Sequence, residues 1–312
     1  MSALNAPYLH DEDAALAYVE SRLWPNGPTC PHCGNAAQDR ITALKGTSTR
    51  PGVRKCKECR KPFTVKVGTI FESSHVPLHL WLQAIHLICA SKKGISSNQL
   101  HRVLGITLKS AWFLSHRIRE AMKVNGSEPP MGGKGEIIEA DETYLGPGGF
   151  VFVTGEGWKG KRGTAEKMKV VTLVERGGRA RSVKVDSVSS AQVEKIIKEN
   201  AKRDSVLMTD ESPVYERVGA EMKRHFTVNH GKKEYSRGFV STNTVEGYFS
   251  IFKRGMKGVY QHCNERHLER YLAEFDFRYN TRTALGVDDA MRADKALKGV
   301  VGKRLTYKAA GA

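Results

Sequence analysis

The pattern of apolar and polar positions changes along the chain and divides it into regions. Residues 78–90, 96–105 and 108–122 have a helical pattern and are separated by short turns. Short β-rich runs begin at residue 136 and predict strands over 136–144, 169–175, 180–186, 205–210 and 225–229. Helical segments follow the third of these strands, at residues 190–201, and the fifth, around Glu246. We therefore expect a helical region followed by a mixed α/β region.

The order of the elements after residue 136 indicates one fold. The first three strands form a meander, and a Gly177-Gly178 turn joins its second and third strands. Helix, strand, short helix, strand and helix then follow. This is the element order of the ribonuclease-H-like fold, so the predicted class is α/β (α+β).

Four of the six cysteines form two CxxC pairs, Cys30/Cys33 and Cys56/Cys59, which are separated by 22 residues. Two such turns complete a tetrahedral sulfur site for structural Zn²⁺, the arrangement of a zinc ribbon. His32 lies inside the first pair, and we expect it to be exposed because four thiolates already fill the site. Unligated or redox-active cysteines fit this double spacing poorly.

The helical region resembles a helix-turn-helix, because a short helix and a Gly105 turn precede a longer helix. Its polar positions would then be available to a DNA groove or to phosphates, and the candidates are Lys109, Arg117 and Arg119. The alternative is a three-helix unit with a purely structural role.

These features predict a succession of segments. We expect an N-terminal helix (1–24), a zinc ribbon (25–72), a helix-turn-helix unit (73–125), a ribonuclease-H-like catalytic domain (136–285) and a tail (286–312). A Gly/Pro/Ser-rich stretch at 125–135 has the composition of a linker, and the tail contains a possible short helix near 288–298.

Acidic residues end the first and fourth predicted strands of the catalytic region. Asp141 closes the first of these strands and Asp210 the fourth, and the fold would bring the two strand ends side by side. Carboxylate oxygens are ligands for hard cations, and two Mg²⁺ or Mn²⁺ ions roughly 4 Å apart support phosphodiester cleavage. The pair therefore predicts a metal-dependent nucleic-acid enzyme.

The helix around Glu246 offers a third ligand. At 100° per residue, one face of this helix carries Asn243, Glu246, Ser250 and Lys253. Glu246 could bind metal while Lys253 contacts the adjoining phosphate. Asn243 lies one turn earlier on the same face and is the rival ligand; the sequence favours Glu246 because an anionic oxygen binds Mg²⁺ better than an amide.

The net charge of the chain predicts a binding partner. Fifty Lys and Arg oppose thirty-three Asp and Glu, and the net charge of +17 favours a polyanion such as DNA. Basic residues concentrate between residues 157 and 181, where we expect a loop and hairpin that follow a DNA backbone. Candidate contacts from this region and from the helix after Glu246 are Lys159, Lys161, Arg162, Lys169 and Arg254. A GxGxxG pattern at 155–160 is a weak dinucleotide signal, since no helix is predicted after it.

Other classes are disfavoured. No apolar run is long enough to cross a bilayer, and the acidic N-terminus lacks the pattern of a secretory signal. We therefore expect no membrane association and a cytoplasmic location.

Several motifs together resemble the insertion-sequence transposases of the family numbered fifteen ninety-five, whose catalytic part is the ISXO-like DDE domain. The resemblance covers nearly the whole chain and includes CPHCG, RKCKECRKPF, LGITLKSAWFLSHRIREAM, EADETYLG, TDES, VNHGKKEY, TNTVEGYFSIFKRGMKGVYQH and GKRLTY. It implies metal-dependent cleavage at transposon inverted-repeat ends and attack of the freed 3′-hydroxyl on target DNA. Asp141, Asp210 and Lys253 match the family's catalytic positions, and Asn243 or Glu246 the third one. Ser241 replaces a histidine that relatives often carry before Thr-Asn.

Two other functions compete with this reading. One is a non-catalytic DNA-binding regulator, which would have no need of acids at strand ends. The other is a nuclease on the same fold that does not transfer strands. Because a transposase must bring two ends together, we also expect a homo-oligomer on DNA.

Overall fold

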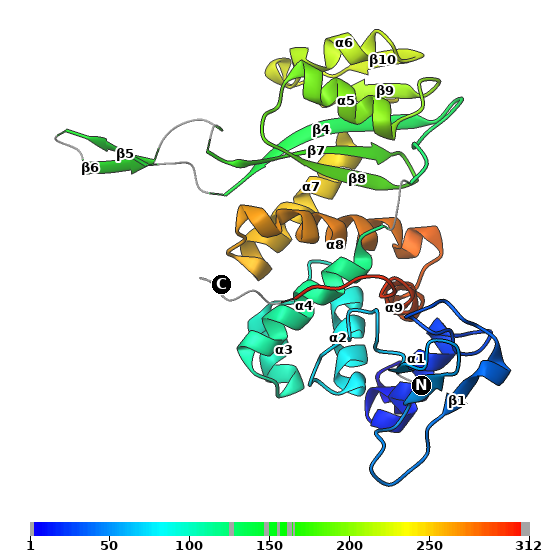
Figure 1. Ribbon diagram of the computed structural model, residues 1–312. Coiled ribbons are helices and arrows are strands. Elements are labelled where there is room, and N and C mark those ends of the chain that lie inside the picture. Colours follow the sequence, from blue (N-terminus) through cyan, green and yellow to red (C-terminus); the bar gives the residue numbers. More distant parts are fainter. Residues whose placement is uncertain are drawn as a thin grey trace. The chain divides into compact units, whose positions relative to one another are not determined.

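The computed structural model describes residues 3–124, 128–146, 150–154, 157–160, 164 and 166–306. The chain folds into two compact units, Met1–Asn125 with Gly286–Ala312 and Gly126–Leu285 (Figure 1). Among the described residues, no helix is both long and apolar enough to cross a membrane.

The first unit is mainly helical. Its longer helices are α1 (Glu12–Leu23), α2 (Leu78–Ala90), α3 (Ser97–Leu104), α4 (Leu108–Met122) and α9 (Asp289–Lys298), after short turns η1 (Ala3–Asn5) and η2 (Pro7–Leu9). Helix α9 is the helix predicted near 288–298, and it packs on α1, α2 and α4. Arg292 anchors it, since its buried guanidinium donates to the Cys89 carbonyl at 3.0 Å. The C-terminal segment is thus part of the first unit.

The α3–α4 hairpin follows from local capping. The side chain of Ser96 accepts a hydrogen bond from the Gln99 N–H, and the side chain of Thr107 accepts one from the Ser110 N–H. Gly105 ends α3 at φ 65°, in the left-handed region that glycine adopts at low cost. The predicted two-helix motif with a glycine turn is therefore present.

The same unit contains a small antiparallel sheet. Its strands β1 (Ile41–Ala43), β2 (Arg54–Cys56) and β3 (Pro62–Phe63) pair in the order β1-β2-β3, and η3 (Gln38–Arg40) precedes them. Trp24 packs edge-on against Phe63 beside the cysteines, at a ring separation of 5.9 Å. This core is too small to hold a sheet without help.

The second unit is built on a five-stranded sheet of order β10-β9-β4-β7-β8. Strands β4 (Ile137–Leu145), β7 (Met168–Glu175) and β8 (Ala180–Val185) form the predicted antiparallel meander. Strands β9 (Val206–Thr209) and β10 (Arg224–Thr227) continue the sheet in parallel on the other side of β4. This strand order and direction are those of the ribonuclease-H-like fold, which confirms the predicted class.

Helices cover both faces of this sheet (Figure 1). One face packs on α5 (Ser190–Asn200), η4 (Pro213–Tyr215) and α6 (Glu216–Gly219), and Ile138 and Leu173 lie in that core. The other face packs on α7 (Asn243–Gly255) and α8 (Leu268–Asn280), with Leu145 and Val170 in its core. Alternate residues of β4 therefore serve opposite faces, and the odd-numbered ones face α7.

Shorter elements complete the second unit. They are β5 (Phe150–Val153), β6 (Gly157–Gly160), η5 (His230–Lys232), β11 (Ser236–Arg237), β12 (Val240–Ser241), η6 (Met256–Tyr260), η7 (Glu265–His267) and η8 (Thr283–Leu285). Strands β5 and β6 pair as an antiparallel hairpin. Residues 157–160 of the GxGxxG pattern thus form a strand, and Gly155 lies outside the described residues. A dinucleotide loop, which opens a helix, does not fit there.

Candidate active site

The four paired cysteines come together in the first unit. The Sγ atoms of Cys30 and Cys59 are 3.6 Å apart, and those of Cys33 and Cys56 are 3.7 Å apart. Four sulfurs bound to Zn²⁺ at ~2.3 Å in a tetrahedron would be separated by about 3.8 Å, so the residues fit the ion. His32 is exposed, as predicted, and its Nε2 lies 3.3 Å from the Pro62 carbonyl oxygen. The set is a structural zinc site.

The two strand-end aspartates lie on neighbouring parallel strands. Strand β4 pairs with β9 in the register Ile137↔Val206 to Glu139↔Met208. When this register is extended by two residues, Asp141 of β4 lies opposite Asp210, which directly follows β9. The prediction that these strand ends adjoin is therefore confirmed, although β4 itself continues to Leu145.

The environment of Asp141 opposes its ionisation. Burial and the negative charges of Glu142 and Asp210 raise the pKa of Asp141 to about 8, and Glu246 adds to the repulsion. Burial also raises the pKa of Asp210, against a hydrogen bond from the Ser212 N–H at 3.1 Å and the nearby His230. The negative charges of Asp210 and Glu246 therefore both act on Asp141, and a bound cation would reduce this repulsion.

Glu142 is a neighbouring carboxylate for which the sequence indicated no role. It lies on the opposite face of β4 from Asp141, and the Tyr215 hydroxyl donates to it at 2.7 Å. Burial raises the pKa of Glu142, and Asp210 raises it further. Tyr215 is fully buried, so this hydrogen bond holds Glu142 in place.

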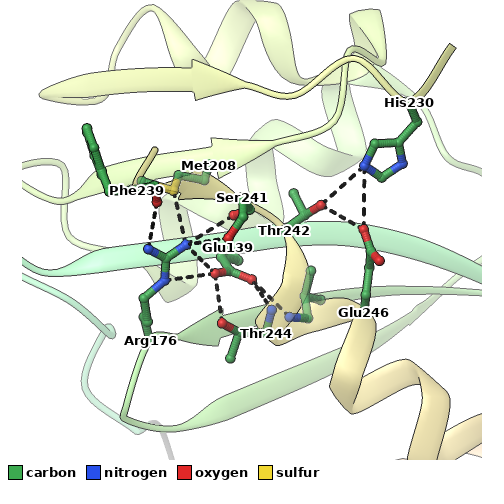
Figure 2. Close-up of polar contacts among 10 residues, drawn as sticks. Glu139, Arg176, Met208, His230, Phe239, Ser241, Thr242, Thr244 and Glu246 are labelled. Atoms are coloured by element: carbon green, nitrogen blue, oxygen red, sulfur yellow. Dashed lines mark hydrogen bonds and ion pairs between the residues drawn. The ribbon is translucent and has the colours of Figure 1, made fainter. Parts of the chain in front are cut away.

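Helix α7 presents the third candidate group beside the strand ends. Glu246 is half-buried and accepts a hydrogen bond from the Thr242 hydroxyl at 2.9 Å (Figure 2). Asn243 is the first residue of α7 and is exposed. Lys253 lies two turns after Glu246, with its Nζ 5.7 Å from the centre of the Phe249 ring. The negative charge of Glu246 also contributes to raising the pKa of Asp141.

His230 joins this site, and the sequence assigned it no role. Its Nε2 is 3.5 Å from a carboxylate oxygen of Glu246 and 3.5 Å from the Thr242 hydroxyl (Figure 2). Glu211 fixes the turn that carries it, by accepting hydrogen bonds from the N–H groups of His230 and Gly231, both at 2.9 Å. His230 belongs to the quoted VNHGKKEY motif, but only the fold brings it to Glu246.

The carboxylates are less tightly gathered than the cysteines. In the described part of the chain, the cysteine set is the only group of three or more potential ligands whose donor atoms all lie within 4.8 Å of one another. Asp141, Asp210 and Glu246 therefore share a field without forming a closed cage.

Two predicted DNA contacts are wrong for this structure, since Arg117 and Arg119 of α4 are buried at 6% and 1% exposure. The Arg117 guanidinium donates to the carbonyls of Ile70, Glu72 and Leu305 at 2.8–3.0 Å. Arg119 donates to the Ser115 hydroxyl at 2.9 Å. The C-terminal segment that covers α4 is remote in sequence, so the helical pattern alone gave no sign of this burial.

The structure describes only some of the other predicted DNA contacts. Lys109 and Arg254 are exposed, and Lys169 is half-buried with its Nζ 3.2 Å from the Lys167 carbonyl. For Lys159 only the backbone is described, in β6, and Lys161 and Arg162 lie outside the described residues.

Comparison with known proteins adds the family. Residues 133–280 match the model of the ISXO2-like transposase domain, and residues 10–62 match that of the transposase zinc-ribbon domain. An uncharacterized protein in the transposable element ISH50 of Halobacterium salinarum is 24% identical over 87% of this chain and 91% of its own length. An uncharacterized transposase-like protein of Haemophilus influenzae is 28% identical over 36% of this chain and 83% of its own.

Among solved structures, the chain is similar to the Mos1 strand transfer complex, with 13% identity and a TM-score of 0.27 over 70% of this chain and 74% of that one. The fold assignment rests on the sheet order described above. The two family models together span the zinc ribbon and nearly all of the sheet-bearing unit. This chain belongs to the DNA transposases that combine a transposase zinc ribbon with an ISXO2-like transposase domain.

Proposed function

We propose that this transposase cleaves DNA at the inverted-repeat ends of its element and joins the freed 3′-hydroxyl to target DNA. The observation that carries the proposal is the shared field of Asp141, Asp210 and Glu246, which lie on β4, after β9 and on α7. A DNA-binding regulator would gain nothing from acids whose charges oppose one another in a half-buried site.

The donor set fits Mg²⁺ or Mn²⁺. Carboxylate oxygens are the ligands that these hard cations prefer. The pKa of Asp141 is raised by burial and then by the negative charges of Glu142 and Asp210, which a cation would balance. Two such ions, when bound, would activate the attacking oxygen and stabilise the leaving one. Asp141, Asp210 and Glu246 would hold them, with exposed Asn243 as the rival or an additional ligand.

The remaining residues of the site would orient DNA. Lys253 lies on the Glu246 face of α7, where its ammonium would contact the phosphate next to the scissile bond. His230 would hold the Glu246 carboxylate toward the aspartates through their 3.5 Å contact. Elsewhere on the chain, Lys109, Lys169 and Arg254 would contact the DNA backbone. Synapsis of two ends would require a homo-oligomer on DNA.

The test uses the full-length, zinc-loaded protein with Mn²⁺ or Mg²⁺ and DNA that carries the element's inverted repeats. We expect Asp210→Ala to lower cleavage and joining by about a thousandfold or more, because it removes a ligand of the metal ions that would stabilise the negative charge of the transition state. Asp186→Asn is the matched control, since Asp186 also follows a strand, β8, but is exposed. Cleavage and joining that persist in Asp210→Ala would overturn the proposal. Cleavage by the wild type without joining would instead identify a nuclease.

A further inference from the structure

An ion pair between the buried carboxylate of Glu139 and the partly exposed guanidinium of Arg176 lies near the candidate metal ligands, and the proposed chemistry does not use it. Glu139 of β4 is 0% exposed, and its Oε1 accepts hydrogen bonds from Arg176 at 2.9 and 2.6 Å and from the Thr244 hydroxyl at 2.8 Å. Its Oε2 accepts the backbone N–H groups of Thr244 at 2.7 Å and Val245 at 3.0 Å. Both carboxylate oxygens are occupied by donors, so Glu139 is not available as a metal ligand.

Glu139 caps helix α7 from a distant part of the chain. Thr242 precedes the helix, but its side chain does not cap it. The first turn of a helix has N–H groups without intrahelical partners, and an anion stabilises that end. A carboxylate more than a hundred residues earlier supplies this anion and thereby ties the start of α7 to strand β4 (Figure 2).

Arg176 extends the connection to two more elements. Following β7, it donates to the carbonyl of Phe239 at 2.8 Å and to the carbonyl and hydroxyl of Ser241, each at 3.1 Å. Its Nη2 also lies 3.4 Å from the Met208 sulfur of β9 (Figure 2). One guanidinium therefore spans β4, β9 and β12, with Glu139 completing the link to α7.

The contacts of this pair stand in regular relation to the candidate ligands. Three residues of this network lie two residues before one of the ligands: Glu139 before Asp141, Met208 before Asp210, and Thr244 before Glu246. We propose that Glu139 and Arg176 are positioning residues that set the spacing of the three metal-binding carboxylates. This inference rests on the proposed function, because it concerns the same site.

The spacing matters because the ligands come from three separate elements. Asp141 is carried by β4, Asp210 by the chain directly after β9 and Glu246 by α7, so any shift of one element against another changes the distances between the ligands. The five hydrogen bonds that the buried Glu139 carboxylate accepts oppose such shifts of Arg176 and of the start of α7 relative to β4. The pair would therefore keep the three carboxylates at the spacing that metal binding requires.

The experiment is a Mn²⁺ titration of the full-length, zinc-loaded protein, with free Mn²⁺ measured by electron paramagnetic resonance. Arg176→Lys keeps the charge but loses the forked contacts, and we expect its Mn²⁺ dissociation constant to rise about tenfold. Glu139→Gln should act in the same direction. The matched control is Arg181→Lys, which alters a half-buried ion pair with Glu128 (2.7 Å) in the same unit and should change the constant less than about twofold.

Thermal unfolding of each variant separates positioning from stability, and titrations are done well below every melting temperature. A lowered melting temperature with wild-type Mn²⁺ affinity in Arg176→Lys would overturn the positioning role and leave the proposed function intact. Asp210→Ala identifies the relevant ion, since it should abolish the same binding. Wild-type Mn²⁺ binding that is insensitive to Asp210→Ala would overturn the proposed function itself, and the positioning role with it.

Discussion

At the scale of single residues, the site is defined by carboxylates placed where ionisation is unfavourable. Asp141 and Asp210 both have raised pKa values, with burial as the main cause in each. Such clustering costs folding free energy in the absence of cations, and natural sequences retain it mainly at functional positions. Arg117 and Arg119 show the reverse case, in which a residue type associated with DNA serves the core.

The raised pKa of Asp141 makes a prediction about stability. The pKa of this group is about 8 in the folded chain against 3.8 ordinarily, so the folded state holds the proton more tightly. The resulting stabilisation is complete below about pH 3.8 and is lost as pH rises through 8. Without added Mg²⁺ or Mn²⁺, Asp141→Asn should therefore raise the melting temperature more at pH 8.5 than at pH 5. The gain is about 2–4 °C for each kcal/mol relieved.

The control for that comparison is Asp186→Asn, because Asp186 is exposed at the end of β8. Its melting temperature should differ from the wild type by the same small amount at both pH values. A benefit of Asp141→Asn that is equal at pH 5 and pH 8.5 would contradict the assigned pKa.

At the scale of elements, the zinc ribbon and the sheet obtain their stability in different ways. The ribbon's buried core consists of Cys30, Cys56, Ile41 and Phe63, and Trp24, Cys59 and Val67 pack against it. The sheet is covered by apolar clusters on both faces. The ribbon should therefore depend on its metal, whereas the sheet should not.

Zinc removal tests this difference. After chelation we expect amide hydrogen exchange in β1 and β2 to rise at least about tenfold, with no change in β4 and β7, and zinc readdition should restore protection. Cys56→Ser should lose bound zinc, while Cys263→Ser, outside the cysteine set, should retain it. Unchanged protection of β1 and β2 in zinc-free protein would show that the strands hold without the ion.

At the scale of the whole molecule, the charge of +17 governs encounter with DNA. Each phosphate contact releases counterions, so DNA affinity should fall steeply as salt increases. Which Lys and Arg side chains contribute to this salt dependence depends on whether each of them is exposed.

Two residues of α4, one exposed and one buried, test this dependence on exposure. Lys109→Ala should reduce the slope of log affinity against log salt by about 1, with little change in melting temperature, because Lys109 is exposed. Arg117→Lys should leave the slope unchanged and lower the melting temperature, because its guanidinium donates to three buried or half-buried backbone carbonyls. Fluorescence anisotropy with inverted-repeat DNA measures the slopes. A lower slope in Arg117→Lys at full stability would show that Arg117 reaches phosphate.

The sequence by itself determined the features whose physical cause is local. Two CxxC turns define a zinc site wherever they meet, and alternation and turn residues define the strands of the meander. The proximity of Asp141 and Asp210 was predictable from the two strands at which they lie, because parallel neighbouring strands bring their equivalent ends together.

Tertiary structure alone decided the features that join distant segments. His230 reaches Glu246 through a turn fixed by Glu211, and Glu139 caps a helix more than a hundred residues later in the chain. Arg117 is buried because the chain near Leu305 returns to cover it. No periodicity encodes such contacts, because hydrogen bonds and burial depend on which surfaces meet after folding and not on neighbours along the chain.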